Sequence, residues 1–188
     1  MKKNILAIIG SASRNSSNLR LVQQIARLSA NSLNIEIFEG LKLLPHFDAN
    51  LSMNRPPEVI EQIRQKIEQA DGILICTPEY IFSMPSGLKN LFEWCVATTI
   101  FSHKPAGLIT ASASGVQAHR ELILIMHTIE AKFTEDTTLL INGIKSKIDL
   151  EGNLQEGLEQ ELEKFVNSFT SLVNQGDPLP FNVKKDYE

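Results

Sequence analysis

The chain has 188 residues, 43% of them hydrophobic, and carries a formal net charge of −4 from 18 basic and 22 acidic residues. This length and composition predict a folded chain with one sizeable core. Because acidic and basic residues are interspersed, no basic tract predicts binding to nucleic acid or to anionic lipid. We therefore expect a small-molecule partner.

The two cysteines, Cys76 and Cys95, lie in apolar surroundings and lack the spacing of metal ligands. They predict buried thiols, with no disulfide framework and no metal site. The apolar run at residues 5–9 is too short for the core of a signal peptide, and no stretch is long enough to cross a membrane. A cytoplasmic location is expected.

Apolar runs alternate with amphipathic stretches along the chain. The runs predict strands at residues 5–9, 35–38, 73–76, 106–110 and 138–141. Spacings of three and four predict helices at residues 17–30, 58–70, 86–96, 115–132 and 154–173. This alternation indicates an α/β fold with a doubly wound parallel sheet between two helical layers, an αβα sandwich, although periodicity leaves the strand order open.

Residues 1–176 are expected to form a single domain, with 177–188 as a loosely attached tail. In open parallel sheets, ligands bind beyond the carboxyl ends of the strands. Candidate functional residues are therefore sought in the loops that follow the predicted strands.

The loop after the first strand, residues 10–18, combines four hydroxyls, two amides and one guanidinium. Hydroxyls and backbone N–H groups at a helix amino terminus can surround a phosphate, and Arg14 can add a charged hydrogen bond. The alternative is that Ser16 or Ser17 only caps the helix. The loop lacks both the Gly-Lys-Ser/Thr of a P-loop and the later glycines of a dinucleotide fingerprint, so a monophosphate fits best.

The loop after the third strand, residues 77–86, contains two prolines that restrict its backbone and two aromatic residues, Tyr80 and Phe82. A loop of this kind can form one wall of a binding site for a flat conjugated ring. The alternative is that both aromatic side chains cover the end of the sheet as part of the core.

Two blocks together resemble the NADPH-dependent FMN reductase family. They are Gly10-Ser11-x-x-Arg14-x-x-Ser17-Asn18 and Pro78-Glu79-Tyr80-x-x-Ser83-x-Pro85-x-x-Leu88-Lys89-Asn90-x-x-x-Trp94. The segment Leu44-Pro45-His46-Phe47-Asp48 also resembles a Leu-Pro-x-Phe-Asp segment of that family. The resemblance extends over roughly residues 4–173.

The resemblance implies a flavodoxin-like fold with strand order 2-1-3-4-5, assembled as a homodimer or homotetramer. It implies FMN as cofactor and NADPH or NADH as co-substrate, with electrons passed by ping-pong hydride transfer to quinones, free flavins, azo compounds or metal oxyanions. No catalytic side chain and no metal are expected. Carried over by position, the FMN phosphate would be surrounded by Ser11, Ser13, Arg14, Ser16, Ser17 and Asn18. The isoalloxazine would be lined by Pro78, Glu79, Tyr80 and Ile81, with Ser112, Ser114 and Gly115 at its other edge.

The chain departs from the family pattern at three places, of which Glu93 in place of aspartate is the smallest change. Ile81 stands where asparagine is common, and the loop after the fourth strand has one glycine, Gly115, where the family loop is glycine-rich. These departures are expected to affect cofactor affinity and acceptor preference. Two rival functions are an FMN-binding electron carrier and a flavodoxin-like binding module without flavin.

Overall fold

The structure is a computed structural model that describes residues 1–13 and 15–175, so Arg14 and the predicted tail 177–188 lie outside the described residues. Within that part, five strands form one parallel sheet in the order β2-β1-β3-β4-β5. The strands are β1 (Lys3–Ile9), β2 (Leu33–Phe38), β3 (Gly72–Thr77), β4 (Ala106–Ser112) and β5 (Thr138–Asn142). The predicted strands and the flavodoxin-like order are confirmed.

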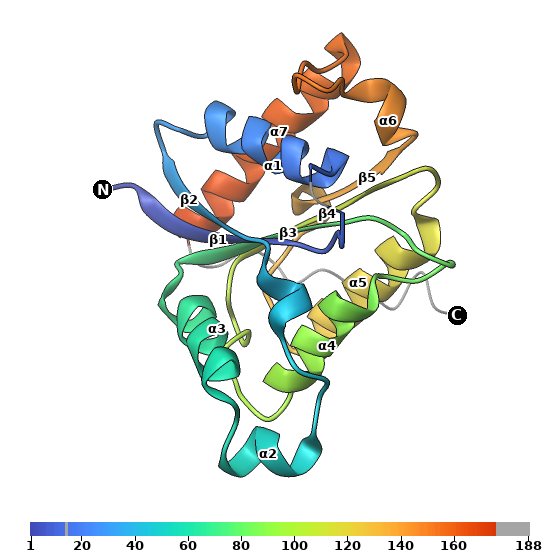
Figure 1. The fold of residues 1–188 in the computed structure, drawn as a ribbon. Helices are drawn as coiled ribbons and strands as arrows, with labels where there is room; N and C mark the ends of the chain where they lie inside the picture. The colour runs from blue at the N-terminus through green and yellow to red at the C-terminus, as the bar shows by residue number, and fades with distance from the viewer. Residues whose placement is uncertain (14, 176–188) are drawn as a thin grey trace.

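Helices cover both faces of this sheet, as Figure 1 shows: α1 and α7 lie on one face, and α3, α4 and α5 on the other. The long helices are α1 (Ser17–Leu28), α3 (Glu58–Gln69), α4 (Ser86–Cys95), α5 (Val116–Thr128) and α7 (Glu156–Gln175). The short ones are η1 (Gly40–Leu43), α2 (Ala49–Asn54), η2 (Glu135–Thr137) and α6 (Ile144–Lys147). The αβα layering predicted from the sequence is therefore confirmed.

Side chains of the central strands alternate between two hydrophobic clusters. In β1, Leu6 and Ile8 pack into the cluster under α3, α4 and α5, whereas Ala7 and Ile9 pack into the cluster under α1 and α7. Successive residues of a strand point to opposite faces, so a sheet covered on both sides needs continuous apolar strands. This explains why the strands read as unbroken apolar runs.

Two predicted helices begin later in the structure, and α5 also ends at Thr128 rather than at residue 132. Helix α5 begins after Gly115, which has φ of 92° and precedes the first helical residue. Helix α7 begins at Glu156 because Leu154 instead pairs with Ile148 in an isolated antiparallel bridge. Both residues therefore lie just outside the helices that the sequence pattern assigned them to.

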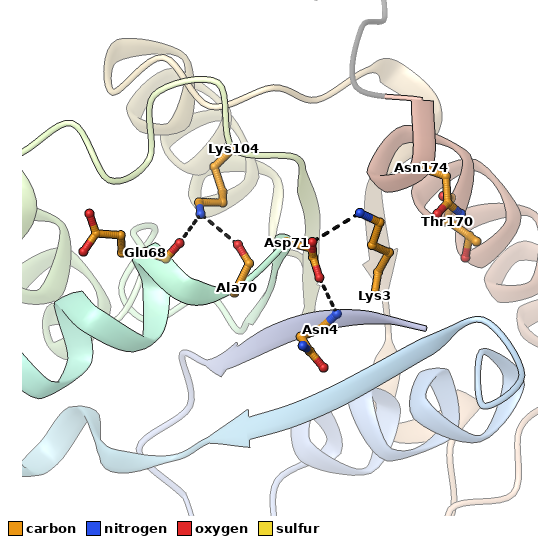
Figure 2. A network of polar contacts seen from close by, with 8 residues as sticks. All are labelled: Lys3, Asn4, Glu68, Ala70, Asp71, Lys104, Thr170 and Asn174. Carbon is orange, nitrogen blue, oxygen red and sulfur yellow. Dashed lines mark hydrogen bonds and ion pairs between the residues drawn. The ribbon is translucent and has the colours of Figure 1, made fainter. Parts of the chain in front are cut away.

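A polar network ties the amino ends of three strands together, at the edge opposite the predicted ligand site (Figure 2). Lys104 Nζ donates to the carbonyl oxygens of Glu68, at 2.9 Å, and Ala70, at 2.8 Å, where α3 ends. Asp71 accepts from the backbone N–H of Asn4 at 2.8 Å and pairs with Lys3 at 3.3 Å. The Asn4 hydrogen bond is the main reason that the pKa of Asp71 is lowered. The network is structural and leaves the carboxyl edge free for ligand chemistry.

Both cysteines are buried, and burial raises the pKa of both thiols, that of Cys95 to about 12. Among residues 1–13 and 15–175, no three His, Cys, Asp or Glu side chains are grouped as metal ligands. In the same part of the chain, no helix has the length and apolar character needed to cross a membrane.

Candidate functional site

The loop after β1 leads directly into α1 and carries most of the predicted phosphate ligands. Ser16 is the N-cap of α1, and its Oγ accepts from the backbone N–H of Leu19 at 3.1 Å. Ser11 Oγ accepts from the backbone N–H of Ser13 at 3.2 Å. The capping alternative therefore holds for Ser16, although its hydroxyl proton can still be donated to an anion.

Asn18 is buried, with 4% of its surface exposed, and its amide joins three segments. Its Nδ2 donates to the carbonyl oxygen of Ala111 at 3.1 Å, and its Oδ1 accepts from Cys76 Sγ at 3.2 Å. Because both ends of the amide are engaged, Asn18 links α1 to the ends of β3 and β4. It thus positions the predicted phosphate-binding loop, described at residues 10–13 and 15–18 and called the phosphate loop below, over the sheet.

The guanidinium of Arg20, which the sequence motifs did not single out, also lies at this loop. Arg20 Nη1 donates to the carbonyl oxygen of Asn15 at 2.9 Å, and Nη2 donates to Ser17 Oγ at 3.2 Å. Asn15 has φ of 57°, so the loop contains a left-handed residue that Arg20 holds in place. Within the described part of the chain, the buried Nε of Arg20 has no hydrogen-bond partner.

A cavity of about 1090 Å³ opens at the carboxyl ends of β1, β3 and β4. Predicted site residues on its walls are Ser11, Ser13, Ser16, Ser17, Asn18, Pro78, Tyr80 and Ser112. Glu79, Ile81, Ser114 and Gly115 are not among its lining residues. The structure therefore brings the phosphate loop together with parts of the other two predicted loops.

One wall of this cavity was not predicted. It consists of Arg20 and the segment that follows β5, namely Gly143, Ile144, Lys145, Ser146, Ile148, Asp149, Leu150 and Glu151. The backbone N–H of Gly143 donates to the carbonyl oxygen of Ala113 at 3.1 Å, which holds this segment beside the loop after β4. In the sequence, this segment is marked only by its position after a strand. Every loop at this edge of the sheet shares that position, so it does not distinguish the segment.

A second cavity, of about 710 Å³, lies on the β2 side of the phosphate loop. Residues 39–43, which include η1, and residues 85–87, at the start of α4, line it. Ser11 and Tyr80 line both cavities, and their hydroxyl oxygens are 3.3 Å apart. Ser13 and Asn15 also line both, so the Ser11–Tyr80 contact lies where the two cavities adjoin.

The loop after β3 makes a tight two-residue turn. Tyr80 and Ser83 exchange backbone hydrogen bonds of 2.9 and 3.1 Å, and Ile81 and Phe82 between them have φ of 51° and 56°. A β-branched residue with positive φ is a strained exception, at a cost of about 1–2 kcal/mol. Tyr80, Ile81 and Phe82 are 43%, 96% and 75% exposed, so the alternative that Tyr80 and Phe82 belong to the core is wrong.

Two carboxylates fasten this turn to α5. Glu79 accepts from the backbone N–H groups of Gly115 at 3.2 Å, Gln117 at 2.9 Å and Ala118 at 3.1 Å. In return, Glu121 of α5 accepts from Ser83 Oγ at 2.7 Å and from the backbone N–H of Met84 at 3.0 Å. Glu79 thus neutralises the helix amino terminus and is a positioning residue for both loops.

Replacing Glu79 with alanine is expected to lower the free energy of unfolding by about 2 kcal/mol, because backbone N–H groups of α5 lose a charged acceptor. Urea unfolding followed by circular dichroism measures the change. Glu93→Ala is the matched control, since Glu93 makes an exposed ion pair with Lys89 and should contribute about 0.5 kcal/mol or less. Equal losses in the two variants would show that Glu79 does not anchor the loops.

A half-buried histidine links α5 to β4. His119, in the second turn of α5, places Nδ1 3.0 Å from Thr110 Oγ1 on β4. Burial lowers the pKa of His119 to about 4, so the imidazole is neutral at neutral pH. It can exchange a neutral hydrogen bond with Thr110 but supplies no positive charge to the site.

Comparison with known proteins supports the predicted family. The sequence model of the NADPH-dependent FMN reductase family matches residues 3–145. The chain is 30% identical over 173 residues to the NADH:(hydroxy)cinnamate reductase subunit CrdA of Vibrio ruber, covering 88% of this chain and 85% of that protein. It is 30% identical over 171 residues to NADPH:quinone oxidoreductase of Arabidopsis thaliana, covering 86% and 87%.

The structure is also similar to FerB, a flavoenzyme NAD(P)H:(acceptor) oxidoreductase from Paracoccus denitrificans. The TM-score is 0.74 at 20% identity, with 93% of this chain and 98% of that chain covered. At this identity the likeness supports the fold, whereas the family match and the two relatives support the activity. The chain therefore belongs to the NADPH-dependent FMN reductase family and is an NAD(P)H-dependent oxidoreductase of the quinone and FMN reductase type.

Proposed function

We propose that this protein holds FMN in the larger cavity and passes electrons from NADPH or NADH to a small-molecule acceptor by ping-pong hydride transfer. The observation that carries the proposal is that residues of the loops after β1, β3 and β4 line the same cavity. Hydroxyls of the phosphate loop, the rigid Pro78 and the aromatic Tyr80 all line one space of about 1090 Å³. A cavity of this size exceeds what one cofactor of FMN's dimensions requires.

The polar end of the cavity suits a phosphate monoester. Ser11, Ser13, Ser16 and Ser17 contribute hydroxyls, and the amino terminus of α1 adds favourable potential for an anion. Asn18 would act through its backbone and its link to Ala111, because its side chain is already hydrogen-bonded. Arg14 stays a predicted phosphate ligand.

The loops after β3 and β4 supply the part of the cavity wall that suits a flat ring. Pro78, Tyr80 and Ser112 would contact the isoalloxazine directly. Glu79, Ser114 and Gly115 would act by fixing the surrounding loops, and Ile81 would offer its backbone. FMN, when bound, supplies the hydride acceptor and electron donor, so the protein needs no acid, base or nucleophile there.

The acceptors we propose are quinones, with free flavins, azo compounds and metal oxyanions as further candidates. The names of relatives favour conjugated organic acceptors, since they include a (hydroxy)cinnamate reductase subunit and quinone reductases. Relatives are named for both NADH and NADPH, so either is a candidate donor. We further propose that residues 1–176 form one FMN-binding domain, and that the protein is a cytoplasmic homodimer or homotetramer.

Anaerobic reduction tests the proposed activity. Protein loaded with FMN is mixed with NADPH and, separately, with NADH, and the absorbance of the oxidised flavin is followed. We expect bleaching with at least one donor and recovery on adding a quinone. An FMN-binding electron carrier would keep the flavin colour with both donors. A binding module without flavin would stay colourless when FMN is added and the excess is removed.

Arg20 provides a test of whether the phosphate of FMN binds at the loop after β1. Arg20→Ala should weaken FMN binding about tenfold, because the loop residues Asn15 and Ser17 lose their anchor. Binding of riboflavin, which lacks the phosphate, should change much less. Fluorescence titration with both ligands measures the ratio, and Arg27→Ala, at the other end of α1, is the matched control. Equal weakening for FMN and riboflavin would place the phosphate elsewhere.

A further inference from the structure

The turn between Tyr80 and Ser83 has side chains that its backbone disfavours. Two-residue turns with positive φ at both central positions usually contain asparagine, aspartate or glycine. Here the two positions are Ile81 and Phe82, with φ of 51° and 56°. Local backbone preference therefore does not explain why these residues are present.

Core packing does not explain them either. Ile81 is 96% exposed and Phe82 is 75% exposed, and neither belongs to the two hydrophobic clusters of the described residues. Nevertheless, the turn is firmly held, because Glu79 and Glu121 attach its two sides to α5. Strained residues fixed by their surroundings concentrate at ligand-binding sites.

The turn borders the candidate site, although Ile81 and Phe82 themselves line neither cavity. Tyr80, directly before Ile81, lines both cavities and contacts Ser11 of the phosphate loop. The two exposed side chains thus directly follow a residue that both cavities share. They are apolar and uncharged, so they would favour contact with an apolar molecule entering there and offer nothing to a strongly hydrated anion.

We propose that Phe82, together with Ile81, forms an apolar rim that contacts flat, uncharged electron acceptors of the quinone class and selects them over charged acceptors. This inference rests on the proposed reductase function. The aromatic ring of Phe82 would pack against the acceptor ring, while the turn held by Glu79 and Glu121 keeps it outside the core. Phe82 is thus assigned a role in acceptor specificity that is separate from FMN binding.

The test compares two acceptors in one protein. Phe82→Asn removes the aromatic ring, and asparagine readily adopts the left-handed turn conformation, so the fold is preserved. With FMN at saturation, kcat/KM is measured for menadione, an uncharged quinone, and for ferricyanide, a charged acceptor. We expect the menadione to ferricyanide ratio to fall about fivefold, mainly through a higher KM for menadione.

Two further variants make the result specific. Phe82→Trp should retain most of the wild-type ratio, and Met53→Asn, which removes an exposed apolar side chain on α2, should leave the ratio unchanged. An unchanged ratio in Phe82→Asn would overturn the proposed role of Phe82 in acceptor specificity. Light scattering that shows a smaller assembly for the variant would also overturn it, because Phe82 would then act at a subunit contact. If wild-type protein reduces neither acceptor, the proposed function itself fails.

Discussion

Replacing Gly10 with alanine is expected to lower the free energy of unfolding by about 3 kcal/mol, because no space exists for the added methyl group. A Cβ on residue 10 would lie 2.3 Å from Thr77 Oγ1, 2.6 Å from Thr77 Cβ and 3.1 Å from Thr77 Cα. Thr77 is fully buried at the end of β3, and the N–H of Gly10 donates to the carbonyl oxygen of Cys76 at 2.8 Å. Relief would require the two strand ends to separate.

That separation would also alter the site, since the phosphate loop starts at Gly10 and the loop that includes Tyr80 starts after Thr77. We therefore expect weaker FMN binding in Gly10→Ala together with the lower stability. Gly157→Ala is the control, because Gly157 lies in α7 and an added methyl group there would have no atoms within 4 Å, so alanine should be neutral or slightly stabilising. Urea unfolding of both variants at neutral pH makes the comparison. A loss below about 1 kcal/mol in Gly10→Ala would contradict the close approach of β1 and β3.

Acidification is expected to destabilise the protein through His119 by up to about 3 kcal/mol. The folded pKa is about 4, whereas an unfolded histidine titrates near its ordinary value of 6.5. Between these values the unfolded chain binds a proton that the folded chain excludes, so stability falls as pH decreases from 6.5 to 4. Above pH 6.5 both states are neutral at this residue, and below pH 4 the loss reaches its limit.

His119→Gln should remove this part of the pH dependence, because glutamine keeps a polar group near Thr110 without titrating. The measurement is urea unfolding at pH 7 and pH 4.5 for wild type and variant. His127→Gln, an exposed change on the same helix, is the control and should retain the wild-type difference between the two pH values. If His119→Gln retains it too, burial of His119 does not govern acid stability.

Much of the fold could be predicted because apolar periodicity reflects burial directly. The five strands and five long helices were expected from that pattern, and α7 with its buried Leu158, Leu162 and Phe169 is the clearest example. The short helices α2 and α6 were missed. A helix of four to six residues spans little more than one turn, which is too short to display a period, and only the N-cap Asp48 marked the start of α2.

The candidate site was predictable at the level of loops but not of side-chain direction. The hydroxyls of Ser11 and Ser17 do line the cavity, as composition and position indicated. Glu79 was predicted to line a flavin, and the structure adds that its carboxylate caps α5, a contact that could not be predicted because the position of that helix terminus depends on the tertiary structure. The wall that includes Lys145 was missed for the same reason, since it meets the phosphate loop only after folding.

Fluorescence titration of flavin-free protein with FMN and with riboflavin tests the central claim most directly, because it asks whether the cavity at the carboxyl edge of the sheet binds a flavin through its phosphate. We predict saturable quenching at one FMN per chain, with riboflavin bound at least about tenfold more weakly because it cannot use the charged hydrogen bonds of the loop after β1. Failure of FMN to bind, or equal affinity for the two flavins, would contradict the claim.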